Sequence, residues 1–419
     1  MSPSVLTVVV AVAYLVFAEV SALLTQESTD AWSVWLATPM TLGVLLVVSR
    51  ARWFPVLVGA AIGAAVFSWV IEPGRIAWAG GYAAIEVLSA IAGAWAAHQV
   101  APIPLTLERT REVAALVVGA AVLALVGAGI GAAWTAAAGS GGVLQTFYLW
   151  ALANFVGALL VAPLVVTWAG FRAKRSGGLT MPQFIGGAVA CVLLLTSLQL
   201  LFGAGAAGRM SGSVGMTLTY PPILFIAVVA LTWDTRGATL AAFAGALVAL
   251  VNTAHGNGPF ALLEGFVGES NLEVQGYAAV IALTGLLIAG LAARQRTLWQ
   301  QARDWRTRFE AAIGAHRMIA YEWDPVSGAF VVTGDTVALV GVPPAAIKTL
   351  ADWLAHVVTD ERDALQTAFA LRADGGTLAP LRYRVQRADG TPVALTDEAE
   401  AIRDHDGTLY RVTGLARVS

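Results

Sequence analysis

The chain has 419 residues, of which 58% are hydrophobic and 12% are charged, and its mean hydropathy is +0.72. A formal net charge of −2 excludes the basic stripe expected of a nucleic-acid-binding surface. The one cysteine, Cys191, excludes a disulfide within the chain and is typical of a small residue buried in an apolar helix. Together these properties favour a membrane protein.

The charged residues divide the chain in two. Of the 52 Lys, Arg, Asp and Glu residues, 21 lie in residues 1–290 and 31 lie in the shorter remainder. A helix that crosses a bilayer needs about 20 apolar residues, and ten stretches of that kind fill the first part. They predict helices over 5–22, 32–49, 53–71, 77–98, 113–133, 146–169, 183–202, 215–233, 237–252 and 274–293.

The loops between these helices differ in charge. Loops on one side carry eight basic residues, whereas the opposite loops carry only Arg75 and Arg209 beside six acidic residues. Short basic loops stay in the cytoplasm, so ten helices predict that both termini are cytoplasmic. The eight basic residues are Arg50, Arg52, Arg109, Arg111, Arg172, Lys174, Arg175 and Arg236; the six acidic residues are Glu27, Asp30, Glu72, Glu264, Glu269 and Glu273.

Two parts of the apolar region are similar in sequence. The segment from Pro39 to Gly59 is matched by the segment from Pro222 to Gly245, and Gly81-Tyr82-Ala83-Ala84 is matched by Gly276-Tyr277-Ala278-Ala279. A parallel repeat places such pairs in the same membrane orientation. Coincidence in a chain rich in Ala and Gly is the alternative.

A few polar residues lie within the apolar stretches. An ionisable side chain in mid-bilayer is costly and usually faces a partner or a cavity. We therefore expect Glu86, and Asn154 with its neighbour Trp150, either to form a ligand or proton site or to make an interhelical hydrogen bond. His255 and Asn257 lie in a Gly-rich loop, where they either contact an external ligand or only form a turn.

No motif of catalysis or metal binding is present in the sequence. It contains no HExxH, no P-loop and no spacing that predicts a Ser/His/Asp set. We therefore expect no enzymatic activity, metal or cofactor within these 419 residues.

The chain becomes charged after residue 293. Leu291, Leu298 and Trp305 recur every seven residues, and Ala302 and Phe309 fill the intermediate seam. This pattern predicts a linker helix over 294–308 that forms a short coiled coil. A homodimer through the linker and the following domain is expected from it.

Residues 309–419 are typical of an α+β domain. Strands are expected over 318–324, 329–332, 381–387, 393–401 and 410–418, and a helix is expected over 361–371 with Asp360 as its N-cap. Asp389-Gly390 and Asp406-Gly407 are typical of the tight turns between the last three strands.

This domain resembles a PAS domain. The matching residues are Arg308-Phe309-Glu310, Ala320-Tyr321-Glu322-Trp323-Asp324, Trp353 with Asp360-Glu361-Arg362, Tyr383-Arg384-Val385 and Asp389-Gly390. Val358-Thr359 replaces the His-Pro of the family, and the last strand lacks its Asp-Ile-Thr ending. The domain has no cysteine for a flavin adduct, and His316, His356 and His405 fall at positions expected to be solvated. A small apolar ligand and no ligand both remain open.

Residues 5–293 resemble the bacterial membrane-associated sensor domain of the first type, MASE. The matching stretches are Trp35…Pro39, Arg52-Trp53-Phe54-Pro55, Glu86-Val87-Leu88…Gly93-Ala94, Trp150…Asn154…Gly157…Ala162-Pro163 and Gly256…Gly258-Pro259-Phe260. The family more often has Asp at the position of Asn154. The resemblance implies a polytopic α-helical bundle in the bacterial inner membrane, followed by a cytoplasmic α+β PAS domain.

Three functions follow as expectations. The first is a sensory membrane receptor that relays ligand binding or membrane state through the linker to the PAS domain and a separate signalling partner. The second is the input region of a longer histidine kinase or diguanylate cyclase/phosphodiesterase, which the resemblance implies. The third is a small-molecule transporter, which the repeat and Glu86 suggest.

Overall fold

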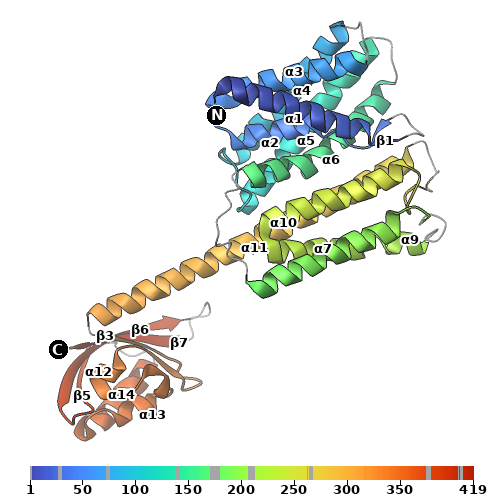
Figure 1. Ribbon diagram of the computed structural model, residues 1–419. Coiled ribbons are helices and arrows are strands. Elements are labelled where there is room, and N and C mark those ends of the chain that lie inside the picture. The colour runs from blue at the N-terminus through green and yellow to red at the C-terminus, as the bar shows by residue number, and fades with distance from the viewer. Residues whose placement is uncertain are drawn as a thin grey trace. The chain divides into compact units, whose positions relative to one another are not determined.

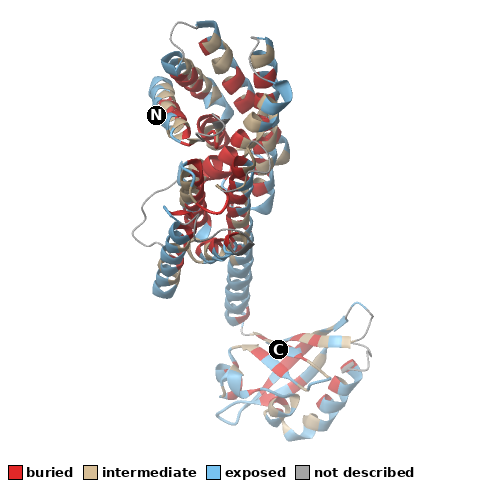
Figure 2. Ribbon diagram, turned by 90° about the vertical axis from the view of Figure 1, so that its right-hand side faces the viewer, coloured by how far each residue is buried: buried red, intermediate tan, exposed pale blue. Residues whose placement is uncertain are grey.

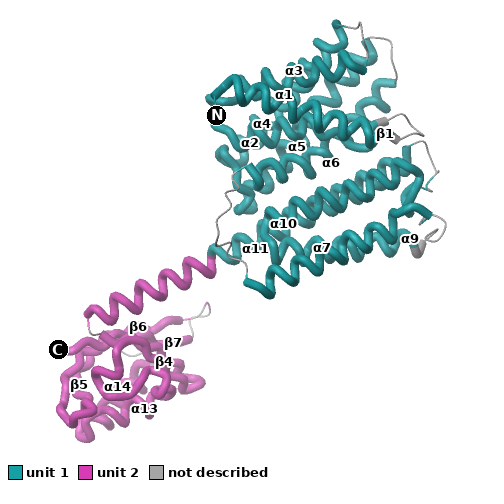
Figure 3. The backbone as a smooth tube through the Cα atoms, viewed as in Figure 1, with its two compact units in different colours: residues 1–297 teal, residues 298–419 magenta. Residues whose placement is uncertain are grey.

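The computed structural model describes residues 2–26, 31–71, 76–137, 142–169, 180–205, 213–261, 263, 268–316, 318–373, 379–403, 405 and 409–419. The chain divides into two compact units, residues 1–297 and residues 298–419 (Figure 3). The first unit is helical and the second is α+β, which confirms the predicted fold class (Figure 1).

Long apolar helices build the first unit. Eight helices in the described residues are long and apolar enough to cross a membrane. Val5, Val8, Val12 and Val16 are exposed on the first helix, as expected where lipid is the solvent. With the shorter α2 and α9, the described helices of this unit are α1 (Pro3–Ala22), α2 (Ala37–Val47), α3 (Trp53–Ile71), α4 (Ile76–Val100), α5 (Thr110–Ala137), α6 (Val143–Ala169), α7 (Met181–Phe202), α9 (Ser213–Thr217), α10 (Pro221–Ala254) and α11 (Glu269–Ala315).

Helix α10 contains two of the ten predicted helices. Asp234 has a positive φ of 60°, which breaks the helix into two arms. A Cβ added at Gly245 would lie 3.8 Å from Ile226 Cδ1, whereas residues so far apart in one straight helix are separated by roughly 28 Å. The two arms therefore fold back on each other. In place of the loop expected over 234–236, only Asp234 has a non-helical conformation.

Helix α2 is shorter than expected. The predicted helix over 32–49 is wrong at its start, because α2 begins at Ala37 and residues 33–36 are buried but not helical. Eleven residues span about 16 Å, roughly half the hydrocarbon thickness. The preceding hairpin of β1 (Thr25–Gln26) and β2 (Ala31–Trp32) marks one end of the bundle, here called the hairpin end.

The buried segment, residues 33–36, makes hydrogen bonds to the end of α1, to α6 and to α11. The Trp35 amide donates to the Ala153 carbonyl of α6 at 3.1 Å. The Leu36 amide donates to Ser21 Oγ of α1 at 2.9 Å, and Gln275 Nε2 of α11 donates to the Ser33 carbonyl at 2.8 Å. The Ser33 amide donates to the Leu24 carbonyl. Buried residues concentrate in this middle part of the bundle (Figure 2).

Glycines on two helices permit matching close contacts. A Cβ added at Gly59 of α3 would lie 3.0 Å from Val10 of α1, and one at Gly245 of α10 would lie 3.2 Å from Leu198 of α7. Gly59 and Gly245 end the two segments that are similar in sequence, Pro39 to Gly59 and Pro222 to Gly245. The glycine of α3 thus packs against α1, and the glycine of the second arm of α10 packs in the same way against α7.

An antiparallel five-stranded sheet forms the frame of the second unit. The strand order is β4-β3-β7-β6-β5. Its elements are β3 (Met318–Trp323), β4 (Phe330–Gly334), α12 (Thr336–Val340), α13 (Leu350–Ala355), α14 (Arg362–Ala373), β5 (Leu381–Gln386), β6 (Pro392–Arg403) and β7 (Leu409–Val418). All five predicted strands are present within about two residues of their expected ends.

One expectation for the second unit is wrong, and several expected turn and loop residues lie outside the described residues. Asp360 is not a helix N-cap, because it lies in a 3₁₀ turn (Thr359–Glu361) and α14 begins after it. Gly390 forms the expected turn with a φ of 80°. The Asp406-Gly407 turn lies outside the described residues, as do Glu27, Asp30, Glu72, Arg75, Arg172, Lys174, Arg175, Arg209 and Glu264 of the expected loops.

A buried ion pair fills the interior of the second unit. Arg372 Nη1 lies 3.0 Å from Asp397 Oδ1, and both side chains are almost completely buried. Tyr321 and Tyr383 donate hydrogen bonds to the same carboxylate, at 2.9 and 3.3 Å. Burial raises the pKa of the Asp397 carboxyl above its ordinary value, although Arg372 and both tyrosines favour the ionised form. Aromatic rings pack around this network, including Phe369, over which Arg372 lies.

We predict that Arg372→Met destabilises the second unit by about 3–5 kcal/mol, because it leaves Asp397 buried and unpaired. Pulse proteolysis of the full chain in urea, following the C-terminal fragment, measures this loss. The double variant Arg372→Met/Asp397→Leu removes both charges and is expected to recover most of it. Equal losses in the single and double variants would contradict a charge-based cause.

We predict that Gly157→Ala prevents normal packing of the bundle, because the added Cβ would overlap the Trp35 carbonyl oxygen. Unfolding of the purified chain by SDS in mixed micelles measures the effect, expected as a loss of about 1–3 kcal/mol. Gly129→Ala is the control, since a Cβ there meets no atom within 4 Å. Equal stability of the two variants would show that the close approach is unimportant.

A candidate ligand site around Glu86

Glu86 lies inside the helical unit with two hydrogen-bond donors on one carboxylate oxygen. It lies near the middle of α4 and is 9% exposed. Tyr14 Oη of α1 donates to Glu86 Oε2 at 2.8 Å, and Trp35 Nε1 donates to the same oxygen at 3.3 Å. No described residue donates to Oε1. The carboxylate is therefore positioned by two donors and keeps one acceptor oxygen for another partner.

The Trp35 indole connects Glu86 to the buried segment. Its Nε1 also donates to Thr38 Oγ1 at 2.9 Å. Its ring stacks on Trp32, with centroids 4.5 Å apart, and contacts Phe67 of α3 at 5.7 Å. The ring is thereby held from several sides, and it joins Glu86 to the main chain of residues 33–36.

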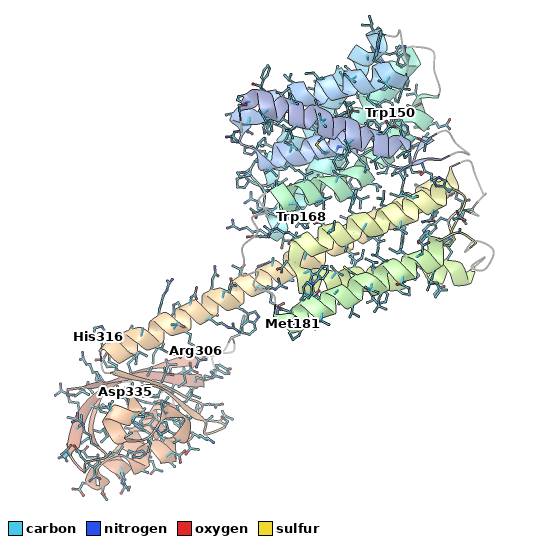
Figure 4. All side chains as sticks on the ribbon, viewed as in Figure 1. Trp150, Trp168, Met181, Arg306, His316 and Asp335 are labelled. Atoms are coloured by element: carbon cyan, nitrogen blue, oxygen red, sulfur yellow. The ribbon has the colours of Figure 1, made fainter. Side chains whose placement is uncertain are left out.

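The structure places Trp150 and Asn154 on α6, which packs on α2 and α5. Asn154 is 7% exposed, and its Nδ2 donates to the Trp150 carbonyl at 3.0 Å, within its own helix. The Trp150 ring stacks on Tyr82 of α4 at 5.7 Å, toward the hairpin end of the bundle (Figure 4). Tyr82 precedes Glu86 by four residues, or about one helical turn. Stacking therefore brings Glu86, Trp150 and Asn154 into one region.

His255 and Asn257 do not belong to the Glu86 region. His255 caps α10, and its Nδ1 lies 2.8 Å from the Val251 carbonyl. Asn257 Nδ2 donates to the His255 carbonyl at 3.2 Å. Both side chains bond to neighbouring main chain, as turn residues do, and the adjacent Phe260 packs on Phe202 and Tyr277.

Several site residues were missed by sequence reasoning. Tyr14 lies in an apolar helix with no local signal of a polar role, and its pairing with Glu86 joins positions 72 residues apart. Trp35 was identified only as part of a family motif, and Tyr82 only as part of the repeat. Their role depends on helix packing, which single-sequence patterns do not specify.

The described residues do not suggest a metal centre. No group of three or more His, Cys, Asp or Glu side chains is placed to hold a metal ion among them. In the second unit, His316 and His405 are exposed and His356 is half-buried, so none of these three lies in its interior.

Comparisons with known proteins identify both units. The MASE1 family model matches residues 5–296, and a PAS fold model matches residues 330–416. The chain belongs to the MASE1 family. It is a multi-pass membrane protein that carries a sensory input module and a PAS domain. A search of curated proteins finds no match.

Two solved structures are similar to part of the chain. One is the N-terminal domain of a diguanylate cyclase with PAS/PAC sensor from Marinobacter aquaeolei, with 20% identity and a TM-score of 0.23; the match covers 24% of this chain and 94% of that one. The other is a sensory box histidine kinase/response regulator from Burkholderia thailandensis E264, with 17% identity and a TM-score of 0.22, covering 26% and 83%.

We predict that Tyr14→Phe lowers the free energy of unfolding of this MASE1 protein by about 1–3 kcal/mol, because a buried carboxylate loses a donor. In a Glu86→Gln background the same substitution is expected to cost less, since a neutral amide needs that donor less. SDS unfolding of the four variants in mixed micelles measures the coupling. Additive effects would show that the Tyr14–Glu86 hydrogen bond contributes nothing.

Proposed function

We propose that the chain is a receptor of the bacterial inner membrane, in which the Glu86 site binds a small ligand and α11 relays binding to the PAS domain. The observation that carries the proposal is the connected set of Glu86, Trp35, Ser33 and Gln275. Arg50, Arg52, Arg109, Arg111 and Arg236 on one side of the predicted topology support cytoplasmic termini.

The relay begins at the Ser33 carbonyl. Ser33 and Gln275 are each 2% exposed, and their hydrogen bond is shielded from water. Trp35 bonds to Glu86 two residues further along the buried segment. A ligand that binds Glu86 differently in two positions of this segment therefore favours one position of α11, which is the thermodynamic requirement for signalling.

Helix α11 has the geometry of a transmitting rod. It is one continuous helix of 47 residues, Glu269–Ala315, or about 70 Å. Arg296 pairs with Asp234, and its Nη2 donates to the Leu231 carbonyl at 2.6 Å. Gln275 and Arg296 thus attach α11 to the bundle at two points about 32 Å apart. Motion at one point reaches the other through a rigid element.

The end of α11 carries an apolar surface that suits a second copy of the chain. Leu298, Trp299 and Trp305 are all more than half exposed, and the heptad spacing of Leu298 and Trp305 is self-complementary. A groove of about 690 Å³ lies beside them, lined by Trp305, Phe309 and residues of β3, β4, β6 and β7. A homodimer through the linker helix and this groove covers the exposed indoles.

The signal is then read by an output enzyme. A histidine kinase or a diguanylate cyclase/phosphodiesterase, in the same polypeptide or in a separate partner, fits the membrane-sensor and PAS combination. The described units supply the input. A change at the dimer interface then rearranges the output enzyme, whether that enzyme is joined to the PAS domain or binds to it.

We predict that Gln275→Leu changes the distance between the two linker helices of the dimer, because it removes the hydrogen bond to Ser33. The measurement is pulsed electron paramagnetic resonance of the full chain in nanodiscs, with a spin label at Thr307→Cys in a Cys191→Ala background. A shift of several ångströms in the distance distribution is expected, on the scale of helix shifts in switching proteins.

Gln300→Leu is the matched control, since it makes the same change at an exposed position of the same helix. It is expected to leave the distribution unaltered. Identical distributions for Gln275→Leu and the parent would contradict the relay, and the absence of any distance between two labels would contradict the homodimer.

A further inference from the structure

We propose that the Glu86 site takes a protonated organic amine, which enters from the hairpin end between aromatic side chains of α4, α5 and α6. This inference rests on the proposed function, because it names the ligand class of the same site. It is carried by two acceptor oxygens to which no described residue donates, and by a row of aromatic rings on the same helices.

Glu86 and Asn154 offer acceptors and no spare donor. Tyr14 and Trp35 already donate to Glu86 Oε2, and Asn154 Nδ2 already donates to a carbonyl. Within the described part of the chain, Glu86 Oε1 and Asn154 Oδ1 have no donor, although both residues are more than nine-tenths buried. A ligand that satisfies them must itself donate, and a positive charge on it also balances the buried carboxylate.

The two oxygens belong to residues at the same depth. Helices α4 and α6 both begin at the hairpin end and run in the same direction. The Tyr82–Trp150 stack fixes their register, and Glu86 and Asn154 each follow their stacked ring by four residues. Both side chains therefore lie about 6 Å beyond the stack along the helices.

Aromatic rings line the way from the hairpin end to these oxygens. Trp78, Tyr82 and Glu86 are spaced by four residues and share one face of α4. The Trp78 ring lies 5.8 Å from Tyr82 and 6.1 Å from Trp134 of α5. Because ring faces are negative, they attract an organic cation before it reaches the carboxylate.

Two glycines keep the rings in place. A Cβ at Gly81 of α4 would overlap the Trp134 indole, and one at Gly131 of α5 would overlap the Trp150 indole. Each indole therefore lies flat on the backbone of the adjacent helix. An ammonium group has three donors and matches two oxygens and a ring face, whereas a hard metal ion such as Ca²⁺ takes six to eight oxygens.

The test is binding of tritiated 2-phenylethylammonium to the purified full chain in nanodiscs at neutral pH. Saturable binding is expected, weakened about tenfold or more by Glu86→Gln and several-fold by Asn154→Leu, because charge-assisted hydrogen bonds are lost. Glu19→Gln is the matched control, since Glu19 is an exposed carboxylate on α1. Its affinity is expected to equal that of the parent. Thermal unfolding of each variant checks that it is folded.

Unlabelled 2-phenylethanol, which has the same ring and no charge, is expected not to compete, and replacing Na⁺ by K⁺ is expected to change nothing. Equal competition by the alcohol, loss of binding in Na⁺, or parental affinity in Glu86→Gln overturns the amine assignment. So does the failure of both 2-phenylethylammonium and n-hexylammonium to bind the parent chain. The linker distances in Gln275→Leu do not depend on any amine, so they test the relay separately.

Discussion

Residues 33–36 leave their main chain non-helical inside an apolar bundle, so protein groups must take the hydrogen bonds that water makes elsewhere. An unpaired main-chain group in hydrocarbon costs several kcal/mol. Carbonyls of Leu24 and Ala153, the hydroxyl of Ser21 and the amide of Gln275 meet this requirement. Ser21 and Leu24 lie at the end of α1, whereas Ala153 lies on α6 and Gln275 on α11. The segment can hence form only when these parts are packed, and their packing is in turn specified by it.

The same constraint creates the candidate site. Because the segment ends at a half-length helix, the Trp35 side chain reaches the middle of the bundle and meets Glu86 there. Gly157 permits this approach, since any larger residue would occupy the space of the Trp35 carbonyl. The carboxylate, the segment and α11 are consequently linked by buried hydrogen bonds rather than by surface contacts. In the second unit, by contrast, the Arg372–Asp397 pair and aromatic rings occupy the interior.

Much of the candidate site could be anticipated, but not its geometry. Glu86 and Asn154 stand out because a polar residue within an apolar stretch is costly in the membrane unless it faces a partner or a cavity. His255 and Asn257 looked similar in sequence, yet they bond to their own turn. Tyr14 and Tyr82 carry no local signal, since tyrosine is common in membrane helices. A site residue differs from a turn residue here because its side chain faces another helix. Which helix that is depends on packing between segments that are distant in the sequence.

Hydropathy and charge determined the partition into a membrane bundle and an α+β domain, because the bilayer and water select residues locally. Alternating patterns and turn residues likewise determined the five strands of the PAS domain. Tertiary structure alone decided that the apolar stretch over 32–49 begins as a buried extended segment, that Asp234 folds α10 back on itself, and that Tyr14 and Trp35 share one oxygen of Glu86. In each case the deciding partner lies far away in the sequence, so local propensity for a helix is overruled by hydrogen bonds and close contacts that exist only in the packed bundle.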